Sequence, residues 1–169
     1  MPQLPYHALP EPPEEVTATT VLVRLVDGLG FRYRWATEGL RDEDYEYQPS
    51  PDSMTMKQLL GHIHGLVNWV LQSLGGETQP APKTPTLKEI RGLTLDKISR
   101  VRGLLAEMSS DQLVSLRIRT RGGDYPLWNM INGPLSDALT HVGQVNSWRR
   151  LGGNPVPAHN VFLGKPARE

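Results

Sequence analysis

Four stretches of helical hydrophobic periodicity, separated by clusters of proline and glycine, constrain the fold of this chain more than any other feature. The second stretch is the clearest, because its apolar residues recur at steps of three and four and so share one helix face. These residues are Leu59, Ile63, Leu66, Val67, Val70 and Leu74. The full pattern predicts helices over 13–40, 55–74, 86–108 and 127–151, the last of them kinked at Gly133 and Pro134.

The lengths of these stretches and of their connections predict an all-α fold, a four-helix bundle with long crossover connections. Alternating apolar and basic residues over 114–120 predict a short extended segment before the last helix, followed by a turn at 122–124. A length of 169 residues suits one domain. We therefore divide the chain into a proline-rich N-terminal arm at 1–12, the bundle at 13–155 and a C-terminal tail at 156–169.

Charge and cysteine content exclude several classes of function. The 18 Lys and Arg balance the 18 Asp and Glu, which argues against binding to nucleic acid or to an anionic membrane. The absence of cysteine excludes disulfides, thiolate metal sites and a cysteine nucleophile. We expect a cytoplasmic protein, because no secretory signal is evident and no apolar run approaches the ~18 residues of a membrane helix.

The last predicted helix carries the sharpest chemical feature. Asp137 and His141 are four residues apart, so their side chains project from one face about a turn apart. A carboxylate and an imidazole at this spacing can bind one metal ion. They can equally form a hydrogen-bonded pair in which Asp137 orients the ring.

The second predicted helix carries His62 and His64. Two residues apart on a helix, their side chains point about 200° apart, so they cannot both face one site. Either ring could be a ligand, and either could instead be a histidine satisfied at the edge of the core.

Other polar and aromatic residues are assigned to structure rather than to chemistry. We expect the tryptophans to fill the core or its rim, the terminal histidines to lie at the surface, and the acidic run to be a solvated loop. These residues are Trp35, Trp69, Trp128 and Trp148, then His7 and His159, then Asp42, Glu43, Asp44 and Glu46.

Two of these helical segments resemble the DinB-like family of bacterial four-helix bundles. The segment Thr55-Met56-Lys57-Gln58-Leu59-Leu60-Gly61-His62-Ile63 is similar to the second-helix signature of that family. The segment Asp137-Ala138-Leu139-Thr140-His141-Val142-Gly143-Gln144-Val145, followed by Trp148-Arg149-Arg150-Leu151-Gly152, resembles its closing helix. The resemblance covers most of the chain in helix order and spacing.

The resemblance implies a divalent metal, with Zn or Ni as the favoured ions, held at one end of the bundle by three histidines. His62 matches the ligand of the second helix and His141 matches the last ligand, whereas Asp137 occupies the position of the remaining histidine. Two outcomes stay open: Asp137 replaces imidazole as a carboxylate ligand, or metal binding is weakened or lost.

The resemblance also implies the kind of reaction. Family members include transferases that use low-molecular-weight thiols and proteins assigned as hydrolases, so we expect a small-molecule substrate and a nucleophile activated by the metal. His64, Gln144 and Trp148 are candidates to line the pocket, and a homodimer is a further expectation. The alternative is a degenerate, non-catalytic bundle that binds a ligand or a partner protein.

Overall fold

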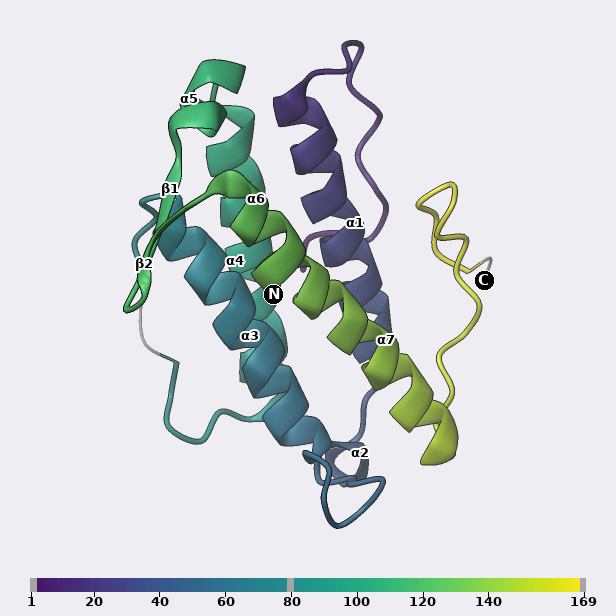
Figure 1. Cartoon of the computed structure of the whole chain (residues 1–169). Helices are drawn as coiled ribbons and strands as arrows, with labels where there is room; N and C mark the ends of the chain where they lie inside the picture. The colour runs from purple at the N-terminus through teal and green to yellow at the C-terminus, as the bar shows by residue number, and fades with distance from the viewer. Residues whose placement is uncertain (1–2, 79–80, 168–169) are drawn as a thin grey trace.

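Four long helices form the body of the protein in a computed structural model that describes residues 3–78 and 81–167. They are α1 (Ala18–Thr37), α3 (Met56–Ser73), α4 (Leu87–Ala106) and α7 (Ser136–Leu151). Helices α1 and α3 each pack against both α4 and α7, so that α3 and α7 run side by side in front of α4 (Figure 1). The chain is therefore mostly helical, as the hydrophobic pattern predicts.

Short elements connect the long helices. They are α2 (Asp42–Tyr45), α5 (Ser110–Ser115), β1 (Arg117–Thr120), β2 (Gly123–Pro126), α6 (Leu127–Met130) and the π-helical turn η1 (Ile131–Leu135). Strands β1 and β2 form a two-stranded antiparallel hairpin in which Ile118 pairs with Tyr125. The predicted extended segment is thus confirmed over 117–120, whereas residues 114 and 115 belong to α5 and Asp124 lies in a second strand.

Hydroxyl caps explain where the helices begin. Thr17, Thr55 and Thr86 each accept a hydrogen bond from a backbone N–H three residues later, and the residue at that position bonds back to the cap. Such a capping box satisfies amide groups that the first helical turn leaves unpaired. Because Thr17 provides this cap, α1 begins five residues after Pro13, where the sequence pattern places the start.

The core lies between the long helices and is built from their apolar faces. Leu59, Ile63 and Val70 of α3 are at most 1% exposed, which confirms the face predicted from their spacing. The expectation for the tryptophans is wrong for Trp128, which is 72% exposed, whereas Trp69, 39% exposed, lies at the rim.

The kink predicted in the last helix is present and positions α7. Gly133 has φ −89° and ψ −111°, outside the helical region, and Pro134 follows it without a backbone donor. The helical run is therefore interrupted at η1, and a new helix starts at Ser136. Asp137 consequently lies in the first turn of α7, beside α3.

The ends of the chain pack against α1. Tyr6 is buried over Gly30, and Arg34 donates from Nη1 to the carbonyl of Leu4 at 2.7 Å. The two terminal segments also meet, because the Leu9 N–H donates to the carbonyl of Gly164 at 2.9 Å. The segments predicted as an arm and a tail therefore contribute to the folded structure.

The acidic run contains a structural ion pair rather than only solvated side chains. Asp44 is 4% exposed and receives two hydrogen bonds from the Arg41 guanidinium, at 2.7 and 3.0 Å, and one from Asn154 at 2.6 Å. These hydrogen bonds, led by those of Arg41, lower the pKa of Asp44 to about 2.

None of the helices in the described part of the chain has the length and hydrophobicity needed to cross a membrane.

Candidate metal centre

His62, Asp137 and His141 meet where the start of α7 lies beside α3. His62 lies in the second turn of α3, and Asp137 and His141 lie one turn apart on α7. One ligand atom from each side chain can be chosen so that all three atoms lie within 4.8 Å of one another. The structure therefore brings together the three residues that the sequence suggests as ligands.

The Asp137 carboxylate lies beside both imidazole rings. Its Oδ2 is 3.3 Å from Nε2 of His62, and its Oδ1 is 3.4 Å from Nε2 of His141. The ring centroids of His62 and His141 are 4.7 Å apart, with an interplanar angle of 85°. Both Nε2 atoms thus face one carboxylate from different directions.

These separations approach those of ligands around a common metal ion. Nitrogen and oxygen ligands lie ~2.0–2.2 Å from zinc, so two ligands at a tetrahedral angle are about 3.4 Å apart. The Nε2–carboxylate distances of 3.3 and 3.4 Å are close to that spacing, but they end on different oxygens of Asp137, and the three ligand atoms span up to 4.8 Å. One ion would therefore draw the three side chains closer together. The two imidazoles and one carboxylate also form a donor set that divalent transition metals accept.

A hydrogen bond to Gln144 determines the tautomer of His141. Nδ1 of His141 lies 2.7 Å from Oε1 of Gln144, and a carbonyl oxygen can only accept. In the neutral ring Nδ1 therefore carries the proton, and Nε2 presents its lone pair toward Asp137. A lone pair facing a carboxylate requires a proton or a cation between them, which is the arrangement expected of a metal-ligating histidine.

The cluster is accessible from solvent. The side chains of His62 and Asp137 are 42% and 45% exposed, whereas that of His141 is 13% exposed. The carboxylate of Asp137 borders an open hollow of about 340 Å³. This hollow is lined by Leu66, Trp69, Asn132, Gly133, Pro134, Ser136, Asp137 and Thr140. A small molecule can therefore approach the cluster along an apolar wall.

The cluster lies on the flank of the helical body. Residues of α3 continue on both sides of His62. On the other helix, α6 and η1 precede Asp137 and lead into α7 across the kink at Gly133. The resemblance implies a site at one end of the bundle, so its placement here differs from that expectation.

His64 lies away from this cluster, although the sequence suggests it as a pocket residue. It is buried against α4, where Nδ1 is 3.0 Å from Oγ1 of Thr94 and Nε2 is 3.1 Å from Nζ of Lys97. Burial, and then the charge of Lys97, lowers the pKa of His64 to about 4. His64 lines a separate hollow of about 350 Å³ together with Asn68 and Lys97.

The other two suggested pocket residues have different positions. Gln144 contacts His141 directly, as described above. Trp148 is partly buried against the core and is not among the residues that line the hollow beside Asp137.

Leu66 and Trp69 line the hollow but were missed by sequence reasoning. Their positions relative to His62, four and seven residues later, are the signal that could have identified them. Residues at these steps lie on the same face of a helix.

The structure is similar to the crystal structure of a DinB-like protein, YjoA, from Bacillus subtilis. The two align with a TM-score of 0.60 over 82% of this chain and 96% of YjoA, at 16% sequence identity. No protein-family profile and no curated protein sequence matches the chain. The resemblance to DinB-like proteins is therefore confirmed at the level of the fold.

Proposed function

We propose that this chain is a metal-binding four-helix bundle of the DinB type, with Zn²⁺ or Ni²⁺ held by His62, Asp137 and His141. The observation that carries the proposal is the convergence of the three side chains from two helices. His62 and Asp137 are 75 positions apart along the chain. Their meeting therefore depends on how α3 packs against α7.

Asp137 serves as the third ligand in place of a histidine. A carboxylate reaches less far from the backbone than an imidazole, so Asp137 could share an ion with His62 only if the imidazole of His62 lies close to it. The packing of α3 against α7 compensates, because it brings Nε2 of His62 within 3.3 Å of the carboxylate. Two histidines and one carboxylate leave coordination positions open for a further ligand.

The proposed activity is that of a thiol-dependent transferase or a hydrolase on a small molecule. A divalent ion in this site lowers the pKa of a coordinated thiol or water, which supplies a nucleophile at neutral pH. The chain contains no cysteine, so the thiol would come from a low-molecular-weight cosubstrate. Leu66 and Trp69 would bind the apolar part of the substrate in the hollow beside Asp137.

The test is a calorimetric titration of metal-free protein with Zn²⁺ and with Ni²⁺. We expect one ion per chain, and we expect binding to be lost in the H62A/H141A double variant. His7→Ala is the matched control, because it removes an exposed imidazole outside the cluster. Equal binding by all three proteins, or no binding by the unsubstituted protein, would overturn the proposal.

The position of Asp137 beside two imidazole rings also favours a second candidate function. Protonated His62 and His141 would form ion pairs with Asp137 without any metal, in a non-catalytic bundle that binds a ligand or a protein. Melting temperature distinguishes the two candidates, since a bound metal stabilises the native state by mass action. A chelator lowers the melting temperature of the metal-binding protein as purified and leaves that of the non-catalytic bundle unchanged.

A further inference from the structure

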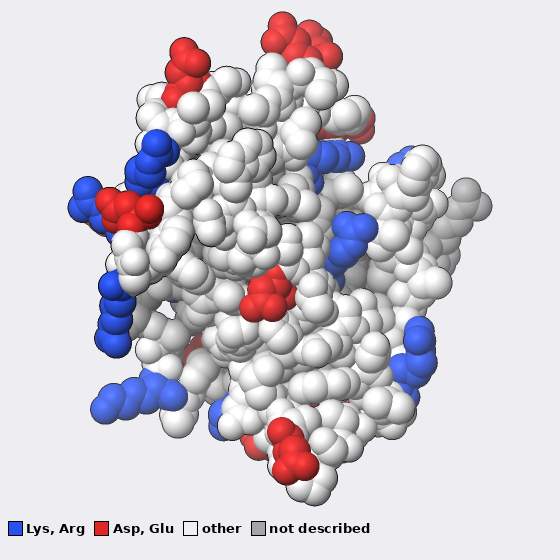
Figure 2. Space-filling view, in the orientation of Figure 1, with Lys and Arg blue, Asp and Glu red and all other residues white. Residues whose placement is uncertain are grey.

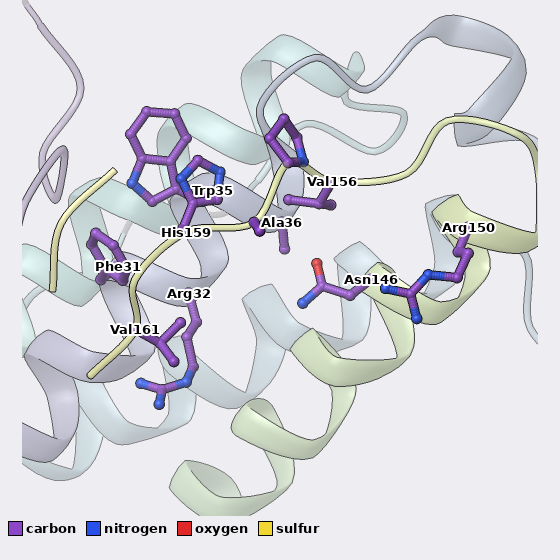
Figure 3. A pocket seen from close by; sticks show the side chains of 11 residues that line it. Phe31, Arg32, Trp35, Ala36, Asn146, Arg150, Val156, His159 and Val161 are labelled. Carbon is purple, nitrogen blue, oxygen red and sulfur yellow. The ribbon is translucent and has the colours of Figure 1, made fainter. Parts of the chain in front are cut away.

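A third hollow lies under the C-terminal segment, on the opposite side of α7 from α3 (Figure 1). It has a volume of about 220 Å³ and is lined by side chains of α1, α7 and residues 156–161. Figure 3 shows Arg32 projecting from α1, with Asn146 and Arg150 projecting from α7. The C-terminal segment crosses above them and carries His159, whose ring lies against Trp35.

The charged groups of this hollow are all cationic. Arg32 and Arg150 are exposed, and neither forms an ion pair within residues 3–78 and 81–167. Among the residues that the structure describes, none that lines the hollow is acidic. Figure 2 shows basic side chains along the seam between the helical body and the C-terminal segment. An anion placed here would lie in a hollow whose two guanidinium groups have no acidic partner in the described part of the chain.

His159 adds a hydrogen-bond donor to the wall. Its Nδ1 accepts a hydrogen bond from the backbone N–H of Ala167 at 2.8 Å, so in the neutral ring Nε2 carries the proton. Burial lowers the pKa of His159, which favours this neutral form. Nε2 is shielded from solvent and has no partner among the described residues.

Asn146 provides a second polar group whose hydrogen-bonding capacity is unused. Its Oδ1 atom is also shielded from solvent and without a partner in the described part of the chain. Polar groups shielded in this way are normally hydrogen-bonded, so two exceptions on one hollow indicate that something else satisfies them.

The remaining walls are apolar and aromatic. Phe31 and Ala36 form the floor on α1, Trp35 is stacked on His159 with a centroid distance of 4.2 Å, and Val156 and Val161 close the side formed by the C-terminal segment. A hollow with apolar walls and a few convergent polar groups is typical of sites for small organic molecules. The polar groups here favour a negative charge on that molecule.

We propose that the hollow between α1, α7 and the C-terminal segment binds a small organic carboxylate with an aromatic or apolar body. The positive charges of Arg32 and Arg150 attract the carboxylate, the Nε2–H of His159 donates to it once the segment has shifted, and Trp35 contacts the body. The segment over 156–161 covers the ligand and shifts to admit it, because the polar atoms beneath the segment are closed to solvent. This site does not depend on the metal centre.

Benzoate is the probe for this site, and NMR titration of ¹⁵N-labelled protein is the measurement. We expect the indole N–H signal of Trp35, identified from its loss in Trp35→Phe, to shift on addition of benzoate. Arg32→Gln and Arg150→Gln should each weaken the affinity about three- to tenfold, because each removes one charged donor. Binding should also weaken as ionic strength rises.

Three controls make the result specific. Arg121→Gln removes the same charge from an exposed arginine of the hairpin turn and should leave benzoate affinity unchanged. Benzamide lacks the charge and inorganic phosphate lacks the apolar body, so both should bind more weakly than benzoate. His141→Ala should bind benzoate normally, which separates this site from the metal centre.

The proposal is overturned if benzoate produces no saturable shift at Trp35. It is also overturned if Arg32→Gln and Arg150→Gln bind benzoate as tightly as Arg121→Gln does, or if benzamide or phosphate binds as tightly as benzoate. Circular dichroism spectra of the variants establish that a loss of binding does not reflect unfolding.

Discussion

The Nδ1 atom of His141 donates a hydrogen bond of 2.7 Å to Oε1 of Gln144. This bond presents the lone pair of the opposite ring nitrogen, Nε2, toward the carboxylate of Asp137. Gln144 lies one turn beyond His141 on α7, so the helix itself sets the geometry of the pair. The orientation of a histidine ring by a neighbouring acceptor is a general feature of metal sites in proteins.

Replacing Gln144 by Ala should weaken Zn²⁺ binding by roughly 10-fold, because loss of an outer partner of a ligating histidine typically costs that much. Gln144→Glu should restore the affinity, since a carboxylate also accepts from Nδ1. Calorimetric titration measures both. The control is Ser147→Ala, a change at an exposed position of the same helix. If Gln144→Ala binds Zn²⁺ as tightly as Ser147→Ala does, Gln144 has no positioning role.

Replacing Asp137 by His tests whether the carboxylate acts as a ligand. Asp137→His supplies a third imidazole at the position where the resemblance implies one, so Zn²⁺ affinity should be kept or increased. Asp137→Ala leaves two ligands and should reduce affinity by more than the roughly tenfold effect of an outer partner. Unchanged affinity in Asp137→Ala, measured by the same titration, would show that Asp137 is not a ligand.

Stability should fall in acid because of Asp44. Its pKa is about 2 in the folded protein, below the ordinary value of 3.8, so the unfolded chain takes up this proton first as the pH falls. The stabilisation is complete above pH ~4 and is lost towards pH ~2. We expect Asp44 to contribute about 1–2 kcal/mol to the free energy of unfolding. This is less than the full equivalent of its pKa shift, because water screens the half-exposed Arg41.

Urea unfolding of Asp44→Asn between pH 2 and pH 7 measures this contribution. The variant should be less stable at pH 7, and its stability should fall less steeply between pH 4 and pH 2. Asp52→Asn changes an exposed carboxylate, and its stability should depend on pH in the same way as that of the unsubstituted protein. Parallel pH profiles for Asp44→Asn and the unsubstituted protein would rule out the proposed role of Asp44.

Two glycines in helices should respond in opposite directions to alanine. A Cβ on Gly30 would lie 2.5 Å from the ring of Tyr6, so Gly30→Ala should displace the N-terminal segment and destabilise the protein by ~1–3 kcal/mol. Gly92 of α4 has open space around it, and Gly92→Ala should stabilise by ~0.5–1 kcal/mol. Thermal unfolding monitored by circular dichroism measures both. A stabilising Gly30→Ala would show that Tyr6 does not pack on α1 in solution.

Much of the helical architecture follows from local features of the sequence. The apolar spacing in 55–74 identifies α3, Thr55 caps it, and Gly75 with φ +77° ends it. Helix α1 is less well predicted, because Pro13, Glu14 and Glu15 suit a first turn as well as Thr17 does. The hydroxyl cap at Thr17 is established only by the observed bonds between Thr17 and Thr20.

The candidate site could be predicted only in part, for a geometric reason. The spacing of Asp137 and His141 places both on one face of α7, whatever the rest of the chain does. The spacing of His62 and His64 shows only that they face different ways. Which ring joins the cluster depends on which side of α3 meets α7 and which meets α4, and the structure directs His62 to α7 and His64 to α4.

The sequence alone therefore determined features that depend on neighbours along a helix. These features are the long helices, the kink at Gly133 before α7, and the placement of Asp137 and His141 on one helix face. The tertiary structure decided features that depend on contacts between distant segments. His62 joins Asp137 from 75 residues away, and the C-terminal segment brings His159 onto Trp35. Helical periodicity specifies which residues share a face, whereas only side-chain packing between helices specifies what that face meets.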